Sequence, residues 1–248
     1  MTDGTFDSAA TRRGPRGAPR LDVSAALAGL RPQPFGHGDP RRVQNPLIEP
    51  LWTGVRALAA IDSETAVLAD EHGQPISGQA DAATALTEAA LADGLVLDGF
   101  LTKLAARDGS GVYVAMDSLP SASQMVSRPL LGIRPTSGED AIKAMEATHE
   151  ARTFGPDDVV RFVAIDLLWL DGESLLDVPL LERRRLLESV LLESDLVRLG
   201  VFVRPPVDAW LGSWRSLGFN GLSYKAANSR YRPGVASNDW ITIPMPRR

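Results

Sequence analysis

The sequence EPLWTGVRAL occupies residues 49–58, and it decides how the rest of the chain is interpreted. Apolar residues continue on both sides, so residues 47–61 predict a pair of strands or one bent strand. Leu51 stands between the charged residues Glu49 and Arg56. Leucine has no lone pair and cannot attack an electrophile, so this position carries no nucleophilic chemistry.

Four further stretches combine strand-like apolar runs with turn residues. In chain order they are LDGFL (97–101), FVAIDLLWLDG (162–172), NGLSYK (220–225), and YRPG (231–234) leading to DWITIP (239–244). Each stretch alone is a weak signal, since Asp-Gly is a common turn. All five stretches in a fixed order are a strong signal of a shared fold.

Taken together, these stretches resemble the nucleotide-binding signatures of ATP-dependent DNA ligases. That family reads E-x-K-x-D-G-x-R, L-D-G-E-L, F-D-L-L-x-L-D-G, E-G-x-x-x-K and D-W-x-K-x-K at the corresponding places. The resemblance runs from about residue 46 to residue 244, and the YRPG stretch favours DNA ligases over capping enzymes or RNA ligases. It implies an α+β adenylation (nucleotidyltransferase) fold, in which two antiparallel β-sheets flanked by helices enclose a nucleotide cleft.

The chain departs from the family where the resemblance places functional groups. Leu51 stands at the lysine that becomes adenylylated, and Thr53 at the neighbouring aspartate. The other departures are Phe100 and Asn220 for two glutamates, Ile165 for the aromatic that lies against adenine, and Thr242 and Pro244 for two phosphate-binding lysines. Glu49, Arg56 and Lys225 are retained and form the predicted remnant nucleotide-binding pocket.

These departures predict a catalytically inactive DNA ligase-like protein, with no catalytic residue and no metal ligand. ATP and magnesium serve the family but are not expected as cofactors here. Leu51, Phe100 and Ile165 are expected to fill the former cleft. The chain would then act as a binding or regulatory module, with a link to DNA repair that rests on the resemblance alone.

Two alternatives remain open at this point. One is an active ligase or nucleotidyltransferase with a relocated nucleophile, for which Lys225 is the candidate because burial would lower its pKa. The other is a structural subunit that partners another ligase. For Arg56, a remnant nucleotide contact and an ion pair with a carboxylate such as Glu49 are weighed equally.

Length and composition predict one main domain. A chain of 248 residues with 44% hydrophobic content can bury a sizeable core. We expect a disordered leader at residues 1–20, a helix and loop at 21–45, and the ligase-like domain at 46–248, with no room for an OB-fold domain after it.

Charge and cysteine content restrict the partners and the chemistry. A net charge of −5 argues against a broadly basic surface, so a protein partner is predicted, and nucleic acid would need a local basic patch. The chain has no cysteine, which excludes thiol chemistry and disulfides. Without a signal sequence or an apolar run of membrane-spanning length, the expected location is the cytoplasm.

Strands and helices mix without strict alternation, which also favours an α+β fold. Strands are expected at residues 66–70, 74–76, 95–103, 112–116, 159–170, 197–203, 221–225 and 240–243; helices are expected at residues 21–30, 82–92, 139–151, 180–193 and 207–217. Residues 32–44 predict a loop, and Asp81 an N-cap.

Two groups of side chains have competing interpretations. Trp210 and Trp214 share a helical face, which predicts core packing or, alternatively, an exposed protein-binding stripe. Asp98 and Asp171 are expected to form turns, and Asp166 to accept a hydrogen bond from neighbouring backbone.

Overall fold

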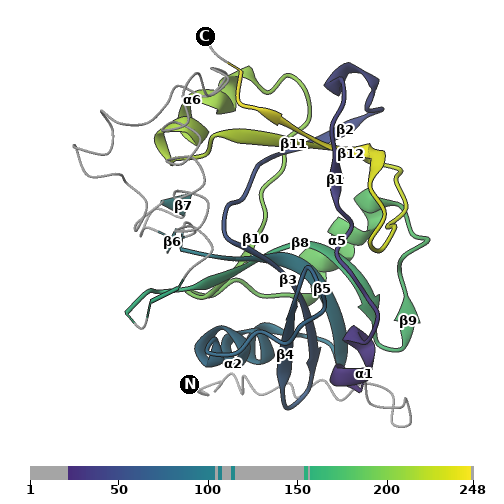
Figure 1. Ribbon diagram of the computed structural model, residues 1–248, viewed down its shortest axis with the longest axis vertical. Coiled ribbons are helices and arrows are strands. Elements are labelled where there is room, and N and C mark those ends of the chain that lie inside the picture. Colours follow the sequence, from purple (N-terminus) through teal and green to yellow (C-terminus); the bar gives the residue numbers. More distant parts are fainter. Residues whose placement is uncertain (1–21, 104–105, 108–112, 115–153, 156, 247–248) are drawn as a thin grey trace, which may run out of the picture.

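The computed structural model describes residues 22–103, 106–107, 113–114, 154–155 and 157–246. Figure 1 shows two β-sheets, one above the other, with helices around them. The predicted leader at residues 1–20 and the predicted helix at residues 139–151 lie outside the described residues, as does most of the strand predicted at residues 112–116.

The smaller sheet has the strand order β1-β12-β11-β2. Its strands are β1 (Phe35–Gly36), β2 (Pro46–Pro50), β11 (Gly221–Ala226) and β12 (Ser237–Pro244). β11 pairs antiparallel with both β2 and β12, whereas β1 pairs parallel with β12. Three of the five signature stretches therefore contribute to this sheet.

The larger sheet has the order β10-β8-β5-β3-β4, and a short β9 also pairs with β8. Its strands are β3 (Val55–Asp62), β4 (Ala66–Asp70), β5 (Gly94–Thr102), β8 (Arg161–Leu170), β9 (Glu173–Ser174) and β10 (Val197–Leu199). Only the β8–β10 pair among these is parallel. A separate pair joins β6 (Ala106–Arg107) to β7 (Tyr113–Val114).

Four α-helices and one short 3-10 helix are described. They are α1 (Val23–Leu27), α2 (Ala80–Ala89), α5 (Leu180–Val190), α6 (Asp208–Ser216) and the 3-10 helix η1 (Pro40–Arg42). In Figure 1, α2 lies below the larger sheet, on the side away from the smaller sheet, and α6 lies beside the smaller sheet.

The alternation of side chains along β3 and β5 explains how the two sheets meet. Ala57, Ala59 and Ile61 point into the core shared with α2, whereas Leu58 and Ala60 point into a second core. That second core also contains Leu47 of β2 and Trp240 of β12, so it lies between the sheets. The same alternation directs Arg56, Asp98 and Phe100 toward the smaller sheet.

The α+β fold with two sheets, predicted from the sequence, is confirmed. The long apolar runs form β5 and β8 as expected. The segments predicted as strands at residues 66–70 and 74–76 lie antiparallel, but the second is only an isolated bridge at Pro75, with the Ile76 N–H donating to the Leu68 carbonyl. Antiparallel pairing dominates, with parallel pairs at one edge of each sheet.

Two local predictions are wrong. Residues 32–44 are not only a loop, because they contain β1 and η1. Helix α2 begins at Ala80 after the N-cap residue Gln79, so Asp81 lies in the first turn and is not the cap. The pair of strands predicted for residues 47–61 is present as β2 and β3; the two strands belong to different sheets, and the chain crosses from one to the other at residues 51–54.

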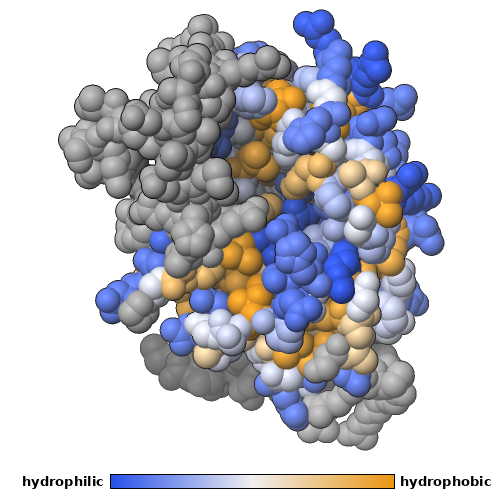
Figure 2. Space-filling view, viewed as in Figure 1, coloured by the Kyte–Doolittle hydropathy of each residue, from blue (hydrophilic) through white to orange (hydrophobic). Residues whose placement is uncertain are grey.

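The surface is mixed in character. On the face shown in Figure 2, apolar side chains reach the surface in separate groups between polar ones. No helix within the described part of the chain has the length and apolar character needed to cross a membrane.

Candidate functional site

The retained residues of the predicted pocket lie together between the two sheets. Lys225 on β11 donates a hydrogen bond from Nζ to Oε2 of Glu49 on β2, at 2.6 Å. The two side chains are 0% and 1% exposed, so this ion pair is fully buried. β2 and β11 are neighbours, with Leu47 opposite Lys225 and Ser223 opposite Glu49, so the two charged residues meet diagonally.

Arg56 has a different partner from the one the sequence suggested. Its Nε and Nη2 atoms donate to the two carboxylate oxygens of Asp98, at 2.6 and 2.5 Å, rather than to Glu49. The Tyr231 hydroxyl also donates to Asp98, at 2.8 Å, and accepts from the Gln33 backbone N–H at 2.9 Å. Asp98 lies in the middle of β5 and is fully buried, so its prediction as a turn residue is wrong.

Aromatic rings complete the surroundings of the two cations. The Phe35 ring centre lies 5.0 Å from the Arg56 guanidinium carbon and 5.7 Å from Lys225 Nζ. Trp240 lies 4.6 Å from Lys225 Nζ, and Phe100 lies 4.8 Å from the Arg56 guanidinium carbon. Such contacts stabilise a desolvated cation. The sequence does not predict Phe35 as a residue of this site, because a lone aromatic between Pro34 and Gly36 gives no strand signal.

Burial and pairing shift the pKa values of these groups in different directions. Burial lowers the pKa of Lys225; the Glu49 carboxylate opposes this, and the positive charges of Arg56 and Arg184 add to it. For Arg56, burial also acts to lower the pKa, but Asp98, together with Tyr231 and Glu49, outweighs burial and the pKa is raised. Burial, reinforced by the Asp98 carboxylate, raises the pKa of Tyr231 well above its usual value.

Apolar side chains occupy the positions expected to fill the former cleft. Phe100 is 8% exposed and Ile165 is 0% exposed, and both belong to one core with Trp52 and Phe219. The Trp52 and Phe219 rings meet edge to face with their centres 4.9 Å apart. Leu51 is half-buried and packs beside Gly221, to whose carbonyl its N–H donates.

The remaining predicted positions lie at the margin of this site. Thr53, Asn220 and Thr242 are half-buried, and Pro244 is exposed. Asn220 accepts a hydrogen bond from the Met245 N–H through its backbone carbonyl. Thr242 stands opposite Ser223 in the β11–β12 ladder. None of these side chains supplies the charge that phosphate or metal binding needs.

The donor set does not fit magnesium or the phosphates of ATP. Among the described residues, no group of three or more His, Cys, Asp or Glu side chains could hold a metal ion. In the remnant pocket, each carboxylate already faces a cation, Glu49 with Lys225 and Asp98 with Arg56.

The other signature aspartates have structural roles. Asp166 accepts from the Leu167 N–H at 2.9 Å, as predicted, and also forms a fully buried ion pair with Arg183 at 2.7 Å. Asp171 has φ +45° in the turn after β8, and its carboxylate accepts from the Gly94 N–H at 2.9 Å, which confirms its prediction as a turn residue.

The two tryptophans of α6, for which core packing and an exposed protein-binding stripe were the alternatives, differ in burial. Trp214 is 3% exposed and lies in the core with Leu211 and Phe219. Trp210 is 49% exposed, although its ring centre is 6.2 Å from that of Trp214. Core packing is therefore confirmed for Trp214 but not for Trp210.

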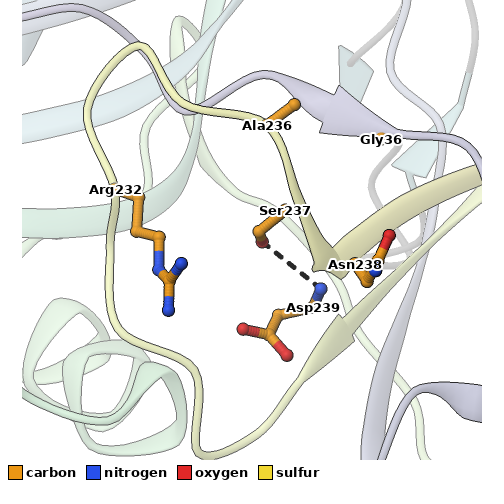
Figure 3. Close-up of a pocket in the computed structure, with 6 residues that line it drawn as sticks. All are labelled: Gly36, Arg232, Ala236, Ser237, Asn238 and Asp239. Atoms are coloured by element: carbon orange, nitrogen blue, oxygen red, sulfur yellow. Dashed lines mark hydrogen bonds between the residues drawn. The ribbon is translucent and has the colours of Figure 1, made fainter.

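A separate cavity of about 350 Å³ lies where β1 meets the start of β12 (Figure 3). Its lining consists of Gly36, Arg232, Ala236, Ser237, Asn238 and Asp239. This lining contains no aromatic ring against which adenine could stack and none of the remnant pocket residues. The cavity is therefore distinct from the site formed by Glu49, Arg56 and Lys225.

Comparisons with known proteins agree with the signatures. Residues 136–243 match the family described as "ATP dependent DNA ligase domain". The multifunctional non-homologous end joining protein LigD of Mycobacterium bovis is 28% identical over 224 residues, which are 90% of this chain and 23% of that protein. A DNA ligase of Thermococcus fumicolans is 37% identical over 82 residues, 32% of this chain and 15% of that protein.

Solved structures share the fold. The crystal structure of the ligase domain of LigD from M. tuberculosis gives a TM-score of 0.57 at 24% identity, covering 87% of this chain and 59% of that one. A mycobacterial DNA ligase D solved with ATP and MES gives 0.56 at 25% identity, covering 86% and 60%. The chain spans less than a quarter of the length of the LigD protein it matches. It is related, in sequence and in fold, to the adenylation domain of ATP-dependent DNA ligases.

Proposed function

We propose that this chain is a DNA ligase-like adenylation domain that does not transfer AMP and acts as a binding or regulatory module. The observation that carries the proposal is the pairing of its own charges: Lys225 is bound to Glu49, and Arg56 to Asp98. An adenylation site needs such groups free to meet ATP, and it needs a nucleophile where this chain has Leu51.

The proposed setting is DNA repair. The LigD relatives are named as non-homologous end joining proteins, and we propose that this chain works in the same process. A net charge of −5 favours a protein partner over direct DNA binding. Co-purification with an active ligase would distinguish a structural subunit from an independent regulator.

The alternative of an active enzyme depends on Lys225. Its lowered pKa favours a nucleophile, but its side chain is 0% exposed and its Nζ is bonded to Glu49 and lies over the Trp240 ring. A phosphorus atom must come within about 3–3.5 Å of the attacking nitrogen. That approach would require the two sheets to separate, so the alternative is disfavoured.

ATP affinity is expected to be weak, with a dissociation constant of millimolar order or worse. Losing several charge-assisted contacts, at about 1.5–3 kcal/mol each, removes most of an affinity of roughly −8 kcal/mol. Calorimetric titration with ATP and magnesium measures this directly. An Arg232→Ala control would expose weak binding in the separate cavity. Saturable micromolar binding that persists in the control would contradict the proposal.

A further inference from the structure

Helices α2 and α5 end side by side. Ala90 and Leu191, the residues that follow them, form an antiparallel bridge. The Leu91 N–H donates to the Val190 carbonyl and the Leu192 N–H to the Ala89 carbonyl, both at 2.9 Å. Two hydrogen bonds thus hold these chain segments at a fixed spacing.

This junction exposes two leucines. Leu91 is 58% exposed and Leu192 is 53% exposed, and they follow the two residues of the bridge. Val190 and Ala92 beside them are half-buried. Because the backbone of both segments is hydrogen-bonded, the leucines are presented by ordered structure, which lowers the entropy lost when a partner covers them.

The segments that carry the two leucines are acidic. Residues 88–93 and 188–195 contain no lysine or arginine, and their carboxylates are all exposed: Glu88, Asp93, Glu188, Glu193 and Asp195. Neither α2 nor α5 has a basic residue in its last turn. The negative ends of two helix dipoles therefore add to the field of these side chains. Arg198 pairs with Asp195 at 3.7 Å but is itself 1% exposed.

We propose that this surface, the leucine–acid patch formed by Leu91, Leu192 and these five carboxylates, docks a basic amphipathic segment of a partner protein. The leucines gain free energy when apolar side chains cover them. The carboxylates around them lose hydration unless lysine or arginine side chains take its place. A helix with apolar residues on one face and basic residues beside it meets both requirements.

Charge complementarity also selects against other occupants. Nucleic acid and anionic membranes carry the same sign as the patch. A second copy of this chain, docked by the same surface around a twofold axis, would bring the two sets of carboxylates together. A wholly apolar partner would leave the carboxylates without counter-charges.

The test measures binding between the full chain and a fluorescein-labelled helical peptide that has leucines on one face and lysines on the others. Fluorescence anisotropy of the peptide reports the binding. Leu91→Ser combined with Leu192→Ser is expected to weaken binding by at least about tenfold. Val235→Ser is the matched control, because Val235 is an exposed apolar residue (54%) elsewhere in the chain and its replacement should have no effect.

A second pair of variants tests the charges. Glu88→Gln with Asp93→Asn should weaken binding several-fold and reduce its dependence on salt, while Glu173→Gln on β9 should change neither. Equal binding by a peptide of the same composition with its leucines scattered would overturn the proposal. So would unchanged binding by the double-serine variant, or a dimer in sedimentation experiments that this variant dissociates.

Discussion

Replacing Lys225 with methionine is expected to lower the free energy of unfolding by about 3–5 kcal/mol, because it leaves a buried carboxylate without a counter-charge. Glu49 is 1% exposed, and its Oε1 atom has no hydrogen-bond partner among the described residues. Lys225 is thus the group that balances its charge. Urea denaturation of the variant beside the natural sequence gives the difference.

The two halves of this pair should respond unequally. Glu49→Gln should cost less than Lys225→Met, since burial already lowers the pKa of Lys225 and the amine can lose its proton. The surface-proximal pair Lys103–Asp158, whose side chains are 21% and 31% exposed, provides the control. Lys103→Met should cost at most about 1 kcal/mol. Equal small losses for all three variants would contradict a structural role for the buried pair.

The same lysine gives a pH dependence of definite sign. Its pKa is lower in the folded protein than in the unfolded chain. Between those two values the unfolded chain binds more protons, so stability rises with pH. This increase in the free energy of unfolding with pH should be absent from Lys225→Met. Urea denaturation of both proteins across alkaline pH measures the difference.

Replacing Gly54 with alanine is expected to lower the free energy of unfolding by about 3–5 kcal/mol or to prevent folding. Gly54 has φ +125°, and a Cβ atom there would lie 2.1 Å from the Leu101 carbonyl oxygen. Backbone strain and a clash with neighbouring backbone therefore act together. Thermal and urea denaturation give the magnitude.

Gly78→Ala separates the two causes. Gly78 also has positive φ, at +78°, but a Cβ atom there would meet nothing within 4 Å. Its replacement should cost only about 1–2 kcal/mol, from the backbone conformation alone. If both variants lost the same stability, the close approach to β5 would have no measurable importance.

Gly54 and Leu51 illustrate two kinds of position in the first signature stretch. Gly54 is required by the backbone where the chain passes from one sheet to the other, whatever the protein does. A lysine at position 51 is required only for nucleotidyl transfer, so a leucine there is compatible with the same fold. Retained turns with altered charged positions are the pattern that the proposed absence of nucleotidyl transfer predicts.

The sequence predicted the long strands well and the short ones badly. β5 and β8 are long, mostly apolar stretches that are buried over most of their length, so their pattern is strong. β1 has two residues next to Pro34, and its pairing with β12 depends on tertiary contact rather than local preference. For the same reason, the sequence of residues 32–44 does not predict that Phe35 contributes to the site.

The partners of the buried charges could not be predicted either. Arg56 lies opposite Phe100 in the β3–β5 ladder, and Asp98 lies opposite Leu58. Only that register brings the guanidinium to Asp98 and leaves Glu49 to Lys225. A Leu-Asp-Gly sequence is compatible with a turn and also with a strand whose aspartate forms an ion pair. The strand register decides between the two, and that register is set by the whole sheet.

Intact mass spectrometry after incubation with ATP and magnesium tests the central claim most directly. The natural chain has three lysines, and we predict no covalent AMP on any of them. Leu51→Lys should also remain unmodified, because the other supporting charges are still missing and such residues act as a unit. A stoichiometric gain of one AMP on the natural chain, mapped to Lys225 or to any other residue, would contradict the account.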